Sequence, residues 1–333
     1  MNMMRMKTVF RKSWVLVLAA AALPGFVSGE EKKDSPVLTA VKSLKLSGYV
    51  QVLGVDWNKD VDSFSLRRAR LSLAGDVIKN LKFKVQLDFV KSPSLLDAIV
   101  EYEPSKAAGL RVGQFTVPFS LENVTPTPDV DTVNRSLVEE SLAPGRDNSA
   151  SGRDVGIAVY GTWSFLEYTA GLFNGAGINK SDTNDHKDFS GRVVVHPFKF
   201  LALGGSLYRG KQSASSTAPL VTRNKEGLEA AFLLSGFSLK SEYIHARDGA
   251  VSKSGAYIQA GYFVVPGKWQ GILKYDTLDG DRSVAGDGKR MITLGVNWII
   301  AGRTRLQLNY EIHRLEGGGT EKSGILAQLQ TAF

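Results

Sequence analysis

Hydrophobic and polar residues alternate along most of the chain. Residues 81–89 read LKFKVQLDF, in which every odd-numbered position is apolar and every even-numbered position is charged or polar. Successive side chains of a β-strand point to opposite faces, so this pattern predicts a strand with one apolar and one wet face. The same alternation predicts sixteen strands, at residues 44–56, 62–77, 80–91, 95–103, 109–117, 153–162, 165–173, 188–197, 200–210, 222–233, 236–248, 253–265, 268–278, 286–300, 302–313 and 321–333.

The connections between these predicted strands alternate in length. Those after even-numbered strands are short, such as 78–79, and those after odd-numbered strands are mostly longer, up to 118–152. In a soluble sandwich the apolar faces pack on a second sheet and edges remain, whereas a membrane barrel has no edge and alternates short periplasmic turns with longer external loops. The pattern therefore favours an all-β fold, a 16-stranded antiparallel transmembrane β-barrel at residues 44–333.

Composition agrees with a single barrel domain. The chain has 333 residues, 22% charged, with 34 glycines and a mean hydropathy of −0.09, so it is neither a helical membrane protein nor a disordered chain. Trp163, Trp269 and Trp298 lie near predicted strand ends, as in an interfacial aromatic girdle, although strand propensity alone is the alternative reading.

The N-terminus predicts export. Basic residues precede the apolar run 14–23, and small residues occupy positions −3 and −1 of a cleavage site after Gly29, which is typical of a signal peptide at 1–29. Its four basic residues, removed from a formal charge of +8, leave +4, which gives no ground for nucleic-acid binding. Residues 30–43 are then a short periplasmic segment, and the expected location is the bacterial outer membrane.

The chain contains no cysteine, so it forms no disulfide and no cysteine-linked lipid anchor. The connection 118–152 is its longest. Because it follows the fifth strand, parity places it outside as the third long loop, and long structureless connections are usually functional. A 16-stranded barrel would otherwise hold a wide aqueous channel, so we expect this loop to fold inward and form the constriction.

Several segments resemble the phosphate-selective porin O and P family. They are GLRVGQFTVPFSLENV at 109–124, NRSL at 134–137, LAPGRD at 142–147, FSLRRARLSLAGDV at 64–77, AGLFNGAG at 170–177 and LGVNW at 294–298. The resemblance covers essentially the whole mature chain. It implies a trimeric, 16-stranded porin whose third loop folds inward and whose basic lumen conducts anions, phosphate above all. The terminal Phe333 resembles the signal that the outer-membrane barrel assembly machinery reads.

Two departures from the family pattern concern the loop. Asn134 stands where the family usually has glutamate. The GRD element occurs twice, at 145–147 and 152–154, which leaves open whether Arg146 or Arg153 takes the family position.

The candidate pore residues follow from setting the apolar residues outward. The basic candidates for lining the pore or binding anions are Arg68, Arg70, Lys82, Lys84, Arg135, Arg146, Arg192, Lys274 and Arg305. The acidic residues expected in the constriction loop are Glu122, Asp129, Asp131, Glu139 and Glu140. Inward strand charges balance, and the loop is net acidic, so distribution rather than total charge must set selectivity.

Two arrangements remain open from these residues. Convergence of Arg135 with the wall arginines would make an anion site, since guanidinium forks suit phosphate oxygens. Acidic residues filling the constriction would instead give a transverse field and weak selectivity. Lys82 and Lys84 have a further alternative, a cross-strand ladder with Glu101 and Glu103.

The sequence gives little support to an enzymatic function. The four histidines are scattered without metal-ligand spacing, and GLFNGAGINK lacks the GK[ST] ending of a phosphate loop. We therefore predict no catalytic residue, cofactor or metal site. We predict a passive porin for small solutes, and the resemblance implies that these are anions such as phosphate. The alternatives are a weakly selective general porin, or a plugged barrel acting as an adhesin or hydrolase. The expected partners are inorganic anions or small polar solutes, outer-membrane lipid and the assembly machinery, with a homotrimer implied by the resemblance.

Overall fold

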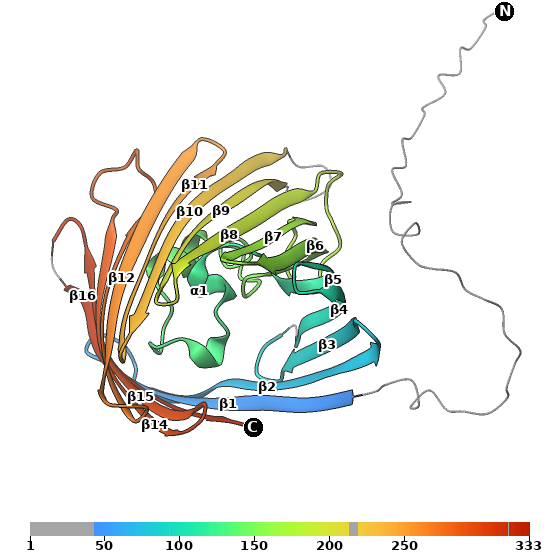
Figure 1. Ribbon diagram of the computed structural model, residues 1–333. Coiled ribbons are helices and arrows are strands. Elements are labelled where there is room, and N and C mark those ends of the chain that lie inside the picture. The colour runs from blue at the N-terminus through green and yellow to red at the C-terminus, as the bar shows by residue number, and fades with distance from the viewer. Residues whose placement is uncertain (1–42, 93, 213–218, 319) are drawn as a thin grey trace, which may run out of the picture. The chain divides into compact units, whose positions relative to one another are not determined.

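The computed structural model describes residues 43–92, 94–212, 219–318 and 320–333. Sixteen strands curve around a common lumen, as Figure 1 shows. They are β1 Ser43–Trp57, β2 Ser63–Ile78, β3 Leu81–Asp88, β4 Leu95–Ser105, β5 Ala108–Thr116, β6 Arg153–Trp163, β7 Leu166–Phe173, β8 Asp188–Phe198, β9 Leu201–Gln212, β10 Val221–Leu234, β11 Phe237–Asp248, β12 Val251–Val265, β13 Trp269–Asp279, β14 Lys289–Ala301, β15 Thr304–Leu315 and β16 Thr320–Ala332.

These strands confirm the predicted architecture. Each of the sixteen predicted segments coincides with one strand, and the largest offsets are at Asp88, predicted to extend to 91, and at Lys289, predicted to begin at 286. The predicted signal peptide and residues 30–42 lie outside the described residues, and Ser43 begins the first strand.

The sheet is antiparallel and closed. Each strand pairs with its sequence neighbours, and β1 pairs with β16 to complete the ring. Beyond that ladder, the backbone of Phe333 exchanges two hydrogen bonds of 3.0 Å with Gly48. A closed ring pairs the backbone groups that an open sheet would leave at its edges, which is what a strand-built wall within lipid requires.

The connections follow the predicted parity. After even-numbered strands they comprise two or three residues, as at 79–80 and 266–268. After odd-numbered strands they are longer, with the turn at 249–250 as the exception. Several short turns place a residue in the left-handed region, such as Asn80 at φ 65°, which a two-residue connection between twisted strands requires.

The two faces of the wall differ in chemistry. Along β14, Leu294 and Val296 are nearly half exposed, while Thr293 and Asn297, which flank them, are buried. This apolar-outward and polar-inward arrangement repeats around the ring and follows directly from the alternation in sequence. No helix among the described residues is long and apolar enough to cross a membrane.

Candidate channel constriction

The connection between β5 and β6, residues 117–152, is called the long loop here. It carries α1 Leu121–Val124, the 3-10 turn η2 Thr127–Asp129 and α2 Leu137–Leu142. In Figure 1 these green elements lie within the ring of strands. Its base is closed by a 2.9 Å hydrogen bond from the Val117 backbone NH to the Gly152 carbonyl.

Serine caps begin both α-helices. The Ser120 hydroxyl accepts from the Asn123 backbone NH, and the Ser136 hydroxyl accepts from the Glu139 backbone NH. Such caps satisfy amide groups that a helix start leaves unpaired. They allow two very short helices to form inside a polar lumen.

A buried carboxylate on β11 holds the start of α1. Glu242 accepts hydrogen bonds from the Ser120 hydroxyl at 2.5 Å, the Leu121 NH at 3.0 Å and the Glu122 NH at 2.6 Å. The Tyr257 hydroxyl donates to the same carboxylate at 2.9 Å. These four hydrogen bonds fix one end of the loop against the wall.

Polar side chains from β14–β16 hold the middle of the long loop through its backbone. Arg305 donates to the Val130 carbonyl at 2.6 Å, and the Asn309 side chain accepts from the Val133 NH at 2.6 Å. Gln307 donates to the Asp131 carbonyl at 2.9 Å. Buried backbone groups must find partners, and here the opposite wall supplies them. Meanwhile α2 packs against β11, β12 and β13.

The loop carboxylates point mainly toward cations of β10, β11 and β13 and of the turn between β14 and β15. Their contacts are Glu122 with Lys274 at 3.5 Å, Asp129 with Arg303 at 2.6 Å, Asp131 with Lys240 at 2.7 Å, and Asp147 with Arg223 and Lys225. Their charge is thus matched by wall cations. Glu140 differs, because its side chain is 50% exposed.

Two loop arginines lie within the loop itself. Arg135 donates to the carbonyls of Glu122 and Thr125, and Arg146 lies 2.8 Å from the Glu139 carboxylate and 3.2 Å from that of Glu140. Both guanidinium groups are at least nine-tenths buried, so they brace the loop fold.

The two buried loop carboxylates that face these arginines differ in proton affinity. Burial opposes ionisation of Glu122, yet Lys274 and Arg135 hold its pKa below the ordinary value. Burial raises the pKa of Glu139 to about 7, although Arg146 lies close by. Neither Glu139 oxygen accepts a hydrogen bond among the described residues, despite the 2.8 Å ion-pair distance. Its ionised form is poorly solvated.

The free side of the loop faces a basic cavity of about 410 Å³, the arginine cavity. Arg67, Arg68 and Lys91 contribute to its lining from the β2–β3 side. Arg67 donates to the side chains of Gln328 at 3.1 Å and Asn134 at 2.8 Å, and Arg68 donates to Gln51 at 2.8 Å. These partners are neutral. Within the described residues, none of the three cations forms an ion pair.

A β-bulge brings the two adjacent arginines to the same side. Gln51 pairs with Arg68 and Val52 pairs with Leu66, so Arg67 is the extra residue of β2. The pore candidates from sequence did not include Arg67, because strict alternation points it outward. A signal was present: the outward apolar positions change from even to odd numbers between Leu66 and Leu71. Such a switch indicates an inserted residue.

Deeper in the lumen, a second cavity of about 180 Å³ separates the long loop from β1–β6. Arg70 lies there in an ion pair with Asp88 at 2.9 Å. Asp97 lies between Lys84 at 2.7 Å and Arg153 at 2.6 Å, so a single carboxylate faces two cations. Arg153 is 8% exposed and lines this cavity together with Arg146.

The expected cross-strand ladder forms in part, because Lys82 pairs with Glu103 whereas Lys84 pairs with Asp97. Lys82 lies 2.7 Å from Glu103, while Glu101 pairs with Arg111 at 2.5 Å. Farther around the wall, Arg192 pairs with Glu229. These charges are mutually compensated.

The predicted basic residues therefore fall into four groups. Arg68 and Arg70 line the free side of the lumen, Arg135 and Arg146 brace the loop, Lys274 and Arg305 tie the loop to the far wall, and Lys82, Lys84 and Arg192 form ion pairs within the barrel wall. Phe333 is 68% exposed at the β1–β16 seam. Within the described part of the chain, no group of three or more His, Asp or Glu side chains is placed to hold a metal ion.

Comparison with known proteins gives a family and several similar folds. The family model described as phosphate-selective porin O and P matches residues 47–223 and 211–331. A comparison with curated protein sequences found no match. The anion-selective porin from Comamonas acidovorans has a TM-score of 0.68 at 17% identity, covering 87% of this chain and 99% of that one.

Two further solved structures share the fold. OmpT of Vibrio cholerae in its trimer form has a TM-score of 0.63 at 11% identity, covering 87% of this chain and 99% of that one. OmpF of Salmonella typhi, solved with daunomycin, has a TM-score of 0.65 at 10% identity, covering 87% and 97%. At these identities the similarity establishes the fold alone.

Proposed function

The chain belongs to the phosphate-selective porin O and P family and forms an outer-membrane channel of the porin type, and from this premise we propose that the channel prefers anions. Small hydrophilic solutes pass by diffusion, and phosphate-like oxyanions are the favoured class. The observation that carries the proposal is the arginine cavity, where Arg67, Arg68 and Lys91 lack ion-pair partners among the described residues.

The separation of charge supports this preference. The long loop turns Asp129, Asp131 and Asp147 toward cations of the far wall, so their field is locally cancelled. The cations of the arginine cavity have no such partner, so their electric field acts on a solute in the open part of the lumen. Charges in a narrow site with low-dielectric walls act strongly on a passing ion, and local charge rather than total charge sets selectivity.

The side-chain chemistry suits oxyanions. Two guanidinium groups and an ammonium supply donors that match phosphate oxygens, without a buried pairing that must first be broken. Burial lowers the pKa of Lys91, with Arg68 and Arg70 contributing in the same direction. A bound anion would reverse this trend by offsetting their mutual repulsion, which favours its entry into the cavity.

A weakly selective channel is the second candidate, and Glu140 favours it. This half-exposed carboxylate lines the same cavity and faces the arginines across it. It would give a transverse field that reduces anion preference. The variant E140Q separates the two candidates. If Glu140 acts on passing ions, E140Q should raise the anion-to-cation permeability ratio, and if it does not, the ratio should stay at the wild-type value.

The remaining assignments extend this proposal. The channel is a homotrimer, by analogy with the trimer form of the Vibrio cholerae protein. Residues 1–29 are a cleaved signal peptide, Phe333 is read by the barrel assembly machinery, and the long loop forms the constriction.

Single-channel reversal potentials under a KCl gradient test the proposal. We expect reversal on the anion side and a reduced chloride current when phosphate is added. The double variant R67Q/R68Q should lower the anion-to-cation permeability ratio by about tenfold, if two charges each contribute about 0.7 kcal/mol at the constriction.

A matched control removes two charges elsewhere. Arg290 and Arg314 are cross-strand neighbours near the ends of β14 and β15, and R290Q/R314Q should leave the ratio near the wild-type value. Cation-side reversal of the wild-type channel, or equal effects of the two double variants, would contradict anion selection at the arginine cavity.

A further inference from the structure

A histidine on β15 reaches the arginine cavity. His313 lines the cavity together with Met291, its register partner on β14. Its side chain is 19% exposed, and its ring meets that of Trp57 on β1 edge to face, with the centroids 5.6 Å apart. An imidazole ordinarily changes its charge between about pH 5 and 8, a range in which arginine stays charged. The lining of the cavity thus includes a group whose charge is set by the surroundings.

A buried carboxylate is hydrogen-bonded to this histidine. His313 Nε2 lies 3.1 Å from Glu311 Oε2, and the Glu311 side chain is fully buried. A carboxylate only accepts hydrogen bonds, so Nε2 carries a proton in this contact and the ring takes up its second proton at Nδ1. Among the residues that the structure describes, His313 is the only ion-pair partner of Glu311.

The same carboxylate is connected to the cations of the cavity. Asn134 donates to both Glu311 oxygens, at 3.0 and 3.1 Å, and accepts from Arg67 at 2.8 Å. One chain of hydrogen bonds therefore runs from His313 through Glu311 and Asn134 to Arg67. Charges in such a chain act on one another more strongly than in water, because the local dielectric constant is low.

Two lysines face this pair from neighbouring strands. Lys322 lies opposite His313 in the β15–β16 ladder, and its ammonium is 4.5 Å from the centre of the Trp57 ring. Lys274 on β13 acts on the carboxylate through space but forms its ion pair with Glu122 at 3.5 Å. Neither lysine therefore replaces the histidine as the partner of the buried carboxylate.

The long loop supplies the remaining charges on this side of the lumen. Arg135 donates to backbone carbonyls of the loop, and the half-exposed Glu140 lies 3.2 Å from Arg146. An exposed carboxylate ordinarily titrates near about pH 4, below the range of an imidazole. Burial raises the pKa of Glu139 to about 7, but this residue is paired with Arg146 and is not part of the cavity lining.

We propose that the Glu311–His313 pair adjusts the anion preference of the channel to pH, an inference that rests on the proposed conducting path through the arginine cavity. With a neutral ring, the pair carries one negative charge beside the cations and offsets part of their field. With a protonated ring, the pair is neutral and the cations act undiminished on a passing anion. Acidic surroundings therefore strengthen anion preference, because local charge sets selectivity.

Reversal potentials of single channels under a KCl gradient, measured from about pH 8 to about pH 5, test the inference. Chloride does not titrate in this range, so a change in the anion-to-cation permeability ratio reports on the protein. We expect the wild-type ratio to rise about threefold on acidification, since removal of two charges is expected to change it about tenfold and the effects of single charges multiply. In H313Q, the side-chain amide can still donate to Glu311, and the ratio should stay near the wild-type value at the alkaline end.

The variant E311Q tests the pair from its other member. It removes the negative charge and retains a side chain of similar shape. Its ratio at the alkaline end should therefore already lie about threefold above that of wild type. Agreement between E311Q in alkaline solution and wild type in acid would not arise from a merely structural role of these residues.

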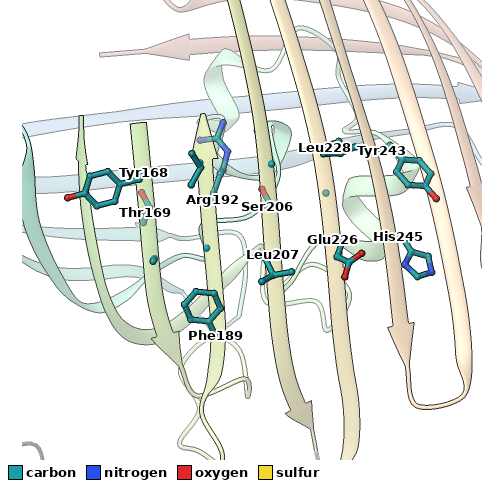
Figure 2. Close-up of a pocket in the computed structure, with 15 residues that line it drawn as sticks. Tyr168, Thr169, Phe189, Arg192, Ser206, Leu207, Glu226, Leu228, Tyr243 and His245 are labelled. Carbon is teal, nitrogen blue, oxygen red and sulfur yellow. The ribbon is translucent and has the colours of Figure 1, made fainter. Parts of the chain in front are cut away.

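The matched control is a histidine on the opposite face of the wall. Figure 2 shows His245 on β11 near Glu226, in a groove of about 620 Å³ on the outer face of β7–β11. Because it faces away from the lumen, H245Q should retain the wild-type rise. The variant E139Q should retain it as well.

Three results would overturn the inference. They are a wild-type ratio that does not rise on acidification, an equal rise in H313Q and wild type, and loss of the rise in E139Q with its retention in H313Q. If R67Q/R68Q lowers the ratio while H313Q leaves its pH dependence unchanged, the inference on the pair fails and the proposed function stands. Absence of an effect in both variants would contradict the proposed conducting path as well.

Discussion

Asn134 illustrates how one side chain connects the loop to both walls of the lumen. Its amide group donates to the Glu311 carboxylate at 3.0 and 3.1 Å, and its carbonyl oxygen accepts from Arg67 at 2.8 Å. A glutamate here would set a second carboxylate beside Glu311 and would neutralise Arg67. The departure from the family pattern at this position therefore leaves Arg67 with a neutral partner instead of a carboxylate.

The proton affinity of Glu139 predicts a pH-dependent stability. Its pKa of about 7 in the folded chain lies above the ordinary value of 4.5, so the folded state holds the proton more tightly. Its stabilising effect is complete below pH 4.5 and is lost as the pH rises to about 7, a change on the order of 3 kcal/mol. Thermal unfolding midpoints should therefore fall more steeply over this range in wild type than in E139Q.

An exposed carboxylate away from Glu139 provides the control for this measurement. Glu316 is half exposed and lies 3.4 Å from Arg290, so E316Q should retain the wild-type slope of midpoint against pH. Parallel curves for wild type and E139Q would show that Glu139 does not ionise with an elevated pKa in the folded barrel.

At the scale of elements, the long loop depends on the start of α1 for its position. In E242A, the Ser120 hydroxyl and the Leu121 and Glu122 amides lose their acceptor, which destabilises the docked loop by on the order of 3 kcal/mol. Trypsin should then cut folded E242A after Arg135 or Arg146 faster than wild type. Fragment masses identify the site of cutting.

Two companion variants sharpen that experiment. E242Q retains one acceptor oxygen and should be intermediate, while E226A, on the outer face, should resist cleavage as wild type does. If E242A and wild type were cut at the same rate, the contacts from β14–β16 would suffice to hold the loop.

The elements also show what can be inferred from sequence. Strand number and loop parity were predictable because successive side chains of a strand face opposite sides, so each strand shows an alternation of apolar and polar residues in the sequence. The bulge at Arg67 was visible as a parity switch between Leu66 and Leu71. The partners of Asp131 and Asp147 were not predictable, because they lie on β10–β12, far along the chain, and depend on how the loop crosses the lumen.

At the scale of the whole molecule, the seam between β1 and β16 predicts a role for Phe333 in assembly. Its backbone extends the ladder to Gly48 while its side chain remains 68% exposed, so truncating the ring removes little packing. We expect F333A to reduce the fraction of heat-modifiable barrel formed in cells several-fold, yet to refold in detergent with nearly wild-type yield.

The two assays separate recognition from stability. Loss of refolding in detergent as well would mean that the ring stabilises the seam, where it covers Gly48 so closely that an added Cβ would lie 2.7 Å from it. Equal yields of F333A and wild type in cells would mean that the assembly machinery does not read this residue.

The bulge of β2 has a consequence for how such channels diversify. One inserted residue exchanges the inner and outer faces of the strand beyond it, and here it turns two neighbouring arginines toward the solute while Phe64 and Leu66 remain in lipid. Deleting Arg67 would restore uninterrupted alternation without exposing a charge to hydrocarbon. On the anion preference proposed above, a single-codon insertion or deletion at this bulge would therefore change ion selectivity, a route that scans of point substitutions never sample.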